Sequence, residues 1–342
     1  MSGHDANIIN EIPDLANPDW RDPKDRRRIA ACLLNVVYQL ERGNEMVNEW
    51  CNLLKFEVAE KITETIQGNE RIFGAVFKWV GESRRVGEVE ELQFPSEVVA
   101  FRGTISEGIY VLRKDIENIW KAINARHASM SGVDIGLHYL QRSIERQRPH
   151  NIWIAGHSLG AAIAVAAVRK MKREDRDKIE AHLFNLPFLS PRLPEVKFFE
   201  MVGRALAAVR DSWRSLALCA PNALDYKMID DEILRGLYND FIGVRDWIPN
   251  IYVGNSDPIS CSYIPYFEKM QGIYEQRSRS LYERMKYLFC FEVAQERTPC
   301  HLLPSARLFV KDTNNHHLGQ WWSRSLKLEG KIFVPPEEAQ LY

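Results

Sequence analysis

Residues 151–169 constrain the fold more than any other part of the sequence. They read N-I-W-I-A-G-H-S-L-G-A-A-I-A-V-A-A-V-R, and residues 152–155 form an apolar run of the length of a buried strand. Residues 161–168 are small and apolar, which allows a helix to lie very close to a sheet. Between the two runs stands G-H-S-L-G, a G-x-S-x-G pattern centred on Ser158. The sequence therefore predicts a strand, a sharp turn at Ser158 and a helix.

A strand-to-helix turn of this kind presents its serine as a nucleophile. The strained backbone requires residues without side chains two positions before and after the serine, and Gly156 and Gly160 meet this requirement. His157 and Leu159 complete the elbow. The N–H group of Leu159 is expected to point to the place where an oxyanion would form. The alternative is that Ser158 is only a small residue in an ordinary turn.

The composition argues against a strongly charged binding surface. The chain has 342 residues, with 45 basic and 46 acidic side chains and a formal net charge of −1, so we expect no nucleic-acid partner. The densest basic run, residues 24–28, contains and adjoins acidic residues. We expect it to be the solvated start of a helix.

The cysteines and the hydropathy pattern suggest a cytoplasmic protein. The six cysteines show no C-x-x-C and no metal-ligand spacing with histidine, so no zinc site is expected. No other metal and no organic cofactor is implied by the sequence. We interpret most of the cysteines as buried thiols of a reducing compartment. The first thirty residues lack the apolar core of a signal peptide, and no stretch approaches the length of a membrane span.

Strand-like and helix-like segments alternate along the chain, which predicts a mostly parallel central sheet flanked by helices. We expect an N-terminal arm over residues 1–25 and a single α/β domain over residues 26–342. Within that domain, the aromatic-rich residues 262–300 are interpreted as a helical cap insertion. The expected strands are residues 71–80, 97–104, 152–155, 180–188, 247–253 and 306–311, and the expected helices include residues 26–50, 53–66 and 132–148.

A serine hydroxyl becomes a nucleophile only when a base takes its proton, and the base needs an acid to orient it. After such an elbow, the acid and the histidine come later in the chain, on loops that follow strands. Asp257 follows one predicted strand, and His316 and His317 follow the next. The order Ser158, Asp257, His316 is that of an α/β-hydrolase fold with a helical insertion between the acid and the histidine.

Other residues compete for two of these roles. Asp246 precedes its predicted strand and would lie at the wrong edge of the sheet, whereas Asp312 shares the loop of the histidines and is a weaker candidate. Adjacent histidines usually point in different directions, so only one of His316 and His317 can be the base. Periodicity does not choose between them, and His317 remains the second choice.

The second oxyanion donor is expected on the loop after an earlier strand. Residues 101–104 read F-R-G-T, in which Gly103 allows a tight bend and Thr104 can offer its N–H group with a hydroxyl to brace it. The alternative is an ordinary strand end with a capping threonine.

With these residues in hand, the chain resembles the class 3 lipases, an α/β-hydrolase group that includes fungal triacylglycerol lipases. It is most similar to plant lipase-like esterases that are often labelled "GDSL esterase/lipase", although no G-D-S-L occurs here. The similarity runs from about residue 20 to about residue 328. It includes V-V-A-F-R-G-T, I-A-G-H-S-L-G-A-A, Y-V-G-N-S-D-P-I-S, Y-I-P-Y-F-E and H-H-L-G-Q-W-W.

The resemblance implies a role for each candidate. Thr104 corresponds to the family's oxyanion residue, Ser158 to the nucleophile and Asp257 to the acid. Counting back from Q-W-W places the histidine of the plant group on His316. Two features depart from the fungal pattern. Ala161 replaces the last glycine of G-H-S-L-G-G, and a long helix is expected where fungal members have a short lid.

Taken together, the sequence predicts an esterase or lipase of lipid metabolism that forms an acyl-enzyme from a carboxylic ester. Its expected partner is an acyl ester, either a small molecule or a lipid. One alternative is an acyltransferase that uses the same acyl-enzyme. The other is a lipase-like signalling or ligand-binding protein without turnover. The oligomeric state and the acyl chain do not follow from the sequence.

Overall fold

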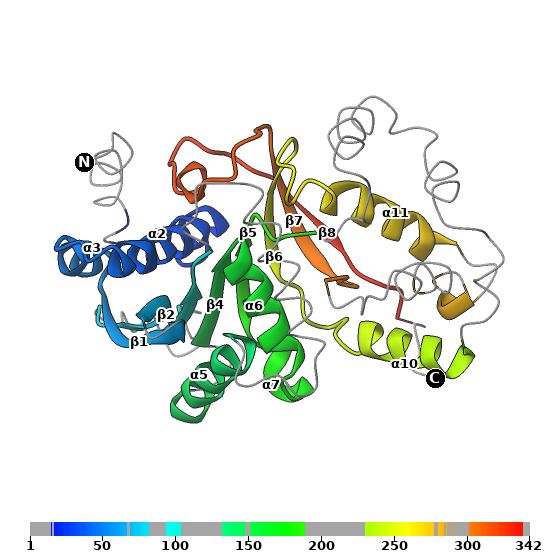
Figure 1. Cartoon of the computed structure of the whole chain (residues 1–342). Coiled ribbons are helices and arrows are strands. Elements are labelled where there is room, and N and C mark those ends of the chain that lie inside the picture. Colours follow the sequence, from blue (N-terminus) through cyan, green and yellow to red (C-terminus); the bar gives the residue numbers. More distant parts are fainter. Residues whose placement is uncertain are drawn as a thin grey trace, which may run out of the picture.

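The computed structural model describes residues 15, 17–66, 69–81, 94–103, 132–147, 151–188, 230–276, 280–283, 285, 289 and 301–337. Over these residues the chain forms one sheet of eight strands, whose order in space is their order in the sequence (Figure 1). The strands are β1 (Phe56–Ile66), β2 (Asn69–Trp79), β3 (Glu97–Phe101), β4 (Ile152–His157), β5 (Glu180–Phe184), β6 (Asn250–Gly254), β7 (Ala306–Lys311) and β8 (Gly330–Phe333). Strands β3 to β7 are parallel, and β1, β2 and β8 extend the sheet in antiparallel pairs. The predicted mostly parallel sheet is confirmed.

Helices cover both faces of this sheet. The described helices are α2 (Pro23–Glu41), α3 (Val47–Leu54), α5 (Gly132–Arg146), α6 (Leu159–Arg169), α7 (Arg173–Arg176), α10 (Asp231–Ile242), α11 (Tyr263–Glu275) and the short 3-10 helix η4 (Leu318–Trp321). Helix α2 packs on one face and α6 on the other, with α5 beside α6 (Figure 1). None of the helices in the described part of the chain is both long and apolar enough to cross a membrane.

Strand β4 divides its side chains between these two layers. Successive residues of a strand point to opposite faces. Trp153 and Ala155 therefore pack on the α2 side, and Ile152 and Ile154 on the α6 side. All six residues of β4 are buried, because the strand lies at the centre of the sheet with a helix on each face.

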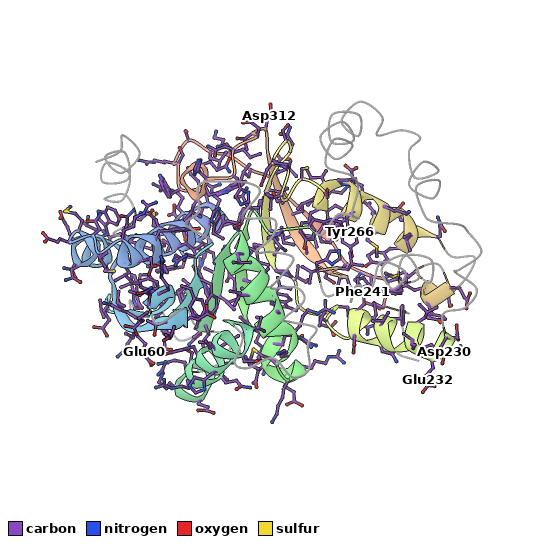
Figure 2. The ribbon with its side chains drawn as sticks, in the orientation of Figure 1. Glu60, Asp230, Glu232, Phe241, Tyr266 and Asp312 are labelled. Carbon is purple, nitrogen blue, oxygen red and sulfur yellow. The ribbon has the colours of Figure 1, made fainter. Side chains whose placement is uncertain are left out.

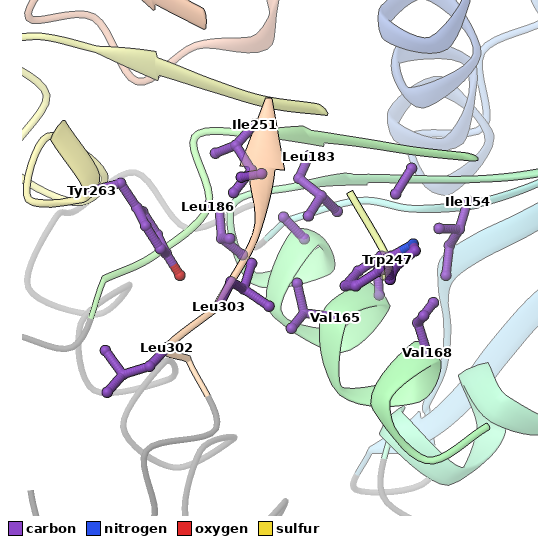
Figure 3. Close-up of a cluster of buried hydrophobic side chains, with 14 of the residues drawn as sticks. Ile154, Val165, Val168, Leu183, Leu186, Trp247, Ile251, Tyr263, Leu302 and Leu303 are labelled. Carbon is purple, nitrogen blue, oxygen red and sulfur yellow. The ribbon is translucent and has the colours of Figure 1, made fainter. Parts of the chain in front are cut away.

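Helix α6 lies close to the sheet because its residues are small. Figure 3 shows Val165 and Val168 of α6 beside Ile154 of β4 and Leu183 of β5, within one buried apolar cluster. Each of these side chains is excluded from solvent. This close packing determines where the N-terminus of α6 lies relative to the end of β4.

The aromatic residues after β6 form part of the core. Tyr263, Tyr266 and Phe267 of α11 are buried, in the same cluster as Phe241 of α10 (Figure 2). Tyr263 and Tyr266 donate their hydroxyl groups to the backbone carbonyls of His301 and Leu303, 2.9 and 2.8 Å away. Helix α11 therefore supplies the first part of the expected helical insertion, and residues 290–300 lie outside the described residues.

The predicted helix over residues 53–66 is wrong. Helix α3 ends at Leu54, Lys55 adopts a left-handed conformation with φ of 57°, and β1 begins at Phe56. Apolar residues at 58, 62 and 66 are four apart. This spacing places them on one face of a helix, but it also places them on one face of a strand, where side chains alternate between the two faces. Antiparallel pairing with β2 over the whole of β1 decides for the strand.

The basic run at residues 24–28 lies at the start of a helix, as expected, but it is not fully solvated. Arg27 and Arg28 are only 3% and 2% exposed. The guanidinium group of Arg27 donates to the backbone carbonyls of Trp321, Ser323 and Leu326, at 2.9 to 3.2 Å. These carbonyls follow β7 in the chain and have no strand partner of their own. The arginine therefore attaches the C-terminal segment to α2.

Replacement of Arg27 by Met is expected to lower the free energy of unfolding by about 3 kcal/mol, because a buried guanidinium group and its hydrogen bonds to three backbone carbonyls are lost. Urea unfolding followed by circular dichroism measures this. The matched control is Arg142→Met, which removes an arginine that is 43% exposed and pairs with Glu60, and which should cost less than about 1 kcal/mol. Equal losses in the two variants would show that the Arg27 contacts contribute no more than a surface ion pair.

Candidate active site

The candidate residues lie at one edge of the sheet. Gly103 follows β3, Ser158 follows β4, Asp257 follows β6 and His316 follows β7. The carboxyl ends of parallel strands meet at the same edge, so residues that are far apart in the sequence come together there. Figure 2 shows Asp312, which marks the loop after β7, at the top of the molecule in that view.

Ser158 occupies a strained backbone conformation with φ of 52° and ψ of −122°. A Cβ atom on Gly160 would lie 2.1 Å from the carbonyl oxygen of Phe101, and one on Gly156 would lie 2.5 Å from Cα of Ala161. Both positions therefore require glycine for reasons of space. The N–H group of Ser158 donates to the carbonyl of Phe184 at 2.9 Å, which ties the turn to β5.

His316 connects Ser158 to Asp257. Its Nε2 lies 2.9 Å from Oγ of Ser158, and its Nδ1 lies 2.9 Å from Oδ2 and 3.1 Å from Oδ1 of Asp257. A carboxylate only accepts, so Nδ1 carries the proton of the neutral ring and Nε2 presents its lone pair to the hydroxyl of Ser158. This arrangement can remove the hydroxyl proton as the oxygen attacks an electrophile.

Asp257 is fully buried and is surrounded by donors. Ser260 Oγ and Asn185 Nδ2 donate to Oδ2, at 2.6 and 2.7 Å, and the N–H group of Ile259 donates to Oδ1 at 3.1 Å. Burial alone would raise the pKa of the Asp257 carboxyl, but the hydrogen bonds from His316, Ser260 and Asn185 lower it below its ordinary value. The acid is therefore held as an oriented anion.

The loops after β6 and β7 are bonded to each other. Asn255 donates from Nδ2 to Asp312 Oδ1 at 2.8 Å and accepts at Oδ1 from the N–H of Thr313 at 3.0 Å. The N–H of Ser256 donates to the carbonyl of Thr313 at 3.1 Å. The loop of Asp257 and the loop of His316 therefore form one hydrogen-bonded unit.

The structure also locates the competing residues. Asp312 is exposed and bonds to Asn255 rather than to a histidine, and Asp246 precedes β6 and pairs with Arg173. The side chain of His317 is exposed, whereas that of His316 contacts both Ser158 and Asp257. The geometry therefore brings together the first-choice residues and leaves the alternatives outside.

Of the two expected oxyanion donors, only Leu159 lies within the described residues. Leu159 is the first residue of α6, and the first N–H groups of a helix have no acceptor within it. Thr104 lies outside the described residues, but Gly103 before it is described. A Cβ on Gly103 would come within 2.9 Å of Cβ of Ser158, so the backbone at this point lies directly against the serine.

Asn185 is a site residue that the sequence did not reveal. It follows β5 with φ of 49°, is fully buried, and donates to Asp257 while its Oδ1 accepts from Nε1 of Trp321 at 2.7 Å. The indole can only donate, so it determines which way the amide faces. The positive φ is typical of asparagine, but no spacing in the sequence links Asn185 to Asp257 or Trp321.

Tyr38 and His157 make contacts at the site that the sequence did not reveal. Nδ1 of His157 lies 2.7 Å from the hydroxyl of Tyr38, and its Nε2 lies 2.9 Å from the backbone carbonyl of His316. Burial, followed by the neighbouring His316, lowers the pKa of His157 to about 3, so its ring is neutral near pH 7. In the sequence, Tyr38 is one residue of a predicted helix, and nothing there indicates a contact with His157.

Comparisons with known proteins agree with the fold. The model of a family described as "Lipase (class 3)" matches residues 39–211, about half of the chain, including Gly103 and Ser158. A relative from Arabidopsis thaliana, named "GDSL esterase/lipase At4g10955", is 25% identical over 337 residues, covering 93% of this chain and 95% of the relative. No solved structure matches the chain.

The burial of neutral His157 predicts a pH-dependent stability. In the unfolded chain His157 takes up a proton below pH 6.5, whereas in the folded chain it does so only near pH 3. The unfolded state therefore binds more protons in this window, and stability falls as the pH drops from 6.5 towards 3, by up to about 1.4 kcal/mol per pH unit. Urea unfolding at pH 6.5, 5.5 and 4.5 measures this slope.

His157→Gln is the matched variant for this measurement, because its amide retains a donor and an acceptor but does not titrate. Its stability should decline less steeply with falling pH than that of the wild type. The contribution of Asp257 is lost only below its ordinary pKa of 3.8, under the measured range. Parallel slopes in the wild type and the variant would contradict the prediction.

Proposed function

The chain belongs to the class 3 lipase family, and from this membership and the geometry at Ser158 we propose that it cleaves carboxylic esters through an acyl-enzyme. The proposal rests on one observation above all. His316 presents Nε2 to the Ser158 hydroxyl at 2.9 Å while its Nδ1 faces the buried carboxylate of Asp257. This is the contact that general-base activation of a serine requires.

The reaction would proceed in two halves. Oγ of Ser158 attacks the ester carbonyl carbon as its proton passes to Nε2 of His316, and a tetrahedral oxyanion forms. The C–O bond to the alcohol then breaks, and the alcohol leaves with the proton from His316. Water attacks the acyl-enzyme in the same way, and the carboxylic acid is released from Ser158.

The remaining residues would stabilise charge. Asp257 stabilises the imidazolium form of His316, and its three other donors keep its carboxylate oriented towards the ring. The oxyanion would be bound by the N–H groups of Leu159 and Thr104. One donor of this kind typically lowers the barrier by about 3 kcal/mol.

The substrate class is proposed as an acyl ester of a lipid or a small molecule. The family match and the name of the Arabidopsis relative, "GDSL esterase/lipase", both support this class. Transfer of the acyl group to an alcohol or amine instead of water would use the same residues. The two outcomes differ in the product that forms when an alcohol is added.

The test combines fluorophosphonate labelling with turnover of nitrophenyl esters of increasing chain length. Ser158→Ala should abolish labelling, and Ser158→Ala, Asp257→Asn and His316→Ala should each lower kcat by about 10³-fold or more, because each removes one member of a unit that acts together. His317→Ala is the control and should retain the wild-type kcat. The chain-length optimum distinguishes an esterase from a lipase.

Two results would overturn the proposal. A folded wild type that neither labels nor turns over any ester would favour a ligand-binding protein of this fold. Loss of activity in His317→Ala, with activity retained in His316→Ala, would exclude the geometry described above.

The role proposed for Asp257 also generates a prediction for Asn185. Asn185→Gly tolerates the positive φ without strain and removes the amide, and with it the hydrogen bond to Asp257 and the one from Trp321. We expect kcat to fall about tenfold, since a hydrogen bond to a charged group contributes about 1.5–3 kcal/mol. Steady-state kinetics on the ester preferred by the wild type measure this.

The control for this variant is Asn250→Ala, which removes a buried amide that donates to the carbonyl of Ala181, away from Ser158. Its kcat should remain within about twofold of the wild type. If Asn185→Gly retained the full kcat as well, the orientation of Asp257 would not depend on Asn185.

A further inference from the structure

Tyr38, in the last turns of α2, contacts the site but has no role in the mechanism proposed above. The Tyr38 hydroxyl lies 2.7 Å from Nδ1 of His157, and the N–H group of Gly103 donates to the same hydroxyl at 2.8 Å. Nε2 of His157 in turn lies 2.9 Å from the carbonyl oxygen of His316. A continuous chain of hydrogen bonds therefore links the loop after β3 to the loop after β7.

The direction of each bond follows from the chemistry of the groups. The His316 carbonyl only accepts, so Nε2 of the neutral His157 ring carries the hydrogen and Nδ1 carries the lone pair. Tyr38 must then donate its O–H to Nδ1, and its oxygen accepts from Gly103. Burial raises the pKa of Tyr38, so the hydroxyl retains the proton that this arrangement needs.

A second contact from the same end of α2 holds the other side of Gly103. The Gly103 carbonyl accepts from Nη1 of Arg102 at 2.7 Å, and Arg102 is paired with Glu41 at 3.3 Å. Nε of Arg102 also donates to the carbonyl of Ile72 at 2.7 Å. Tyr38 and Glu41 thus hold the N–H and, through Arg102, the C=O of one glycine.

The position of Gly103 matters because it lies against the serine. A Cβ placed there would stand 2.8 Å from the Tyr38 hydroxyl, 2.9 Å from Cβ of Ser158 and 3.1 Å from the carbonyl of His157. Both the N–H and the carbonyl of Gly103 are therefore held at the point where its backbone lies against Ser158. At the other end of the chain of bonds, His157 holds the backbone carbonyl of His316. The ring of His316 is the group that contacts Ser158.

We propose that Tyr38 and Glu41 are positioning residues, which hold the Gly103 loop and, through His157, the backbone of His316 in a fixed relation to Ser158. The proposal rests on the serine-hydrolase function above, because it assigns these residues to the alignment of the oxyanion loop with the base. Helix α2 then contributes to catalysis without contacting the substrate.

The test is Tyr38→Phe, which keeps the ring and removes only the hydroxyl. We expect kcat to fall about 30-fold with KM changed less than about twofold, because only the alignment needed in the transition state is lost. The rate of fluorophosphonate labelling should fall by a similar factor. Turnover is expressed per labelled serine, so that unfolded protein does not enter the comparison.

The structure offers a closely matched control in Tyr252→Phe. The hydroxyl of Tyr252 also lies against a buried histidine, His182, at 3.1 Å from its Nδ1, but this pair does not contact Ser158 or His316. Its kcat should remain within about twofold of the wild type, whatever its effect on stability. The double variant Tyr38→Phe/His157→Gln should lose no more activity than the more impaired single variant, because the two residues act in series.

Each outcome has a distinct meaning. If the wild type cleaves esters and Tyr38→Phe retains the kcat of Tyr252→Phe, the positioning role is overturned and the hydrolase function stands. If the wild type neither labels nor turns over, the function fails and the positioning role fails with it. Should Tyr38→Phe not fold, Glu41→Gln tests the same loop, where a fall in kcat at constant KM supports the proposal and an unchanged kcat overturns it.

Discussion

The conformation of Ser158 depends on how closely α6 approaches β3. A non-glycine residue at φ of 52° and ψ of −122° costs about 1–3 kcal/mol and persists only where the surroundings require it. Here the start of α6 packs against the end of β3, so closely that Gly160 has no room for a Cβ beside the carbonyls of Phe101 and Arg102. The small residues of α6 permit this approach, and the site is built around the resulting turn.

The acid and the histidine are joined to each other independently of Ser158. Asn255 links the loops after β6 and β7, and Asn185 and Ser260 orient the carboxylate of Asp257. The segment that follows His316 is attached to α2 by Arg27. The reacting groups are thus held by several hydrogen bonds each, which is how preorganised sites restrict side-chain motion.

Much of the fold could be predicted from the sequence because its signals are local. The buried run before Ser158, the small residues after it and the strand at β7 each carry a period or a length that indicates their structure. The sequence predicts a helix where β1 lies, because apolar residues four apart fit a helix and a strand equally. Its pairing with β2 decided the outcome, and pairing depends on contacts outside the segment.

The sequence by itself determined the residue types of the site and the strands that they follow, because the elbow pattern and the ends of strands are local features. Only the tertiary structure decided that His316 rather than His317 contacts Ser158, and that Tyr38 and Asn185 support the site. The physical reason is that the direction of a loop side chain depends on hydrogen bonds with distant partners. Tyr38 and His157 are 119 residues apart, and no periodicity in the sequence records that contact.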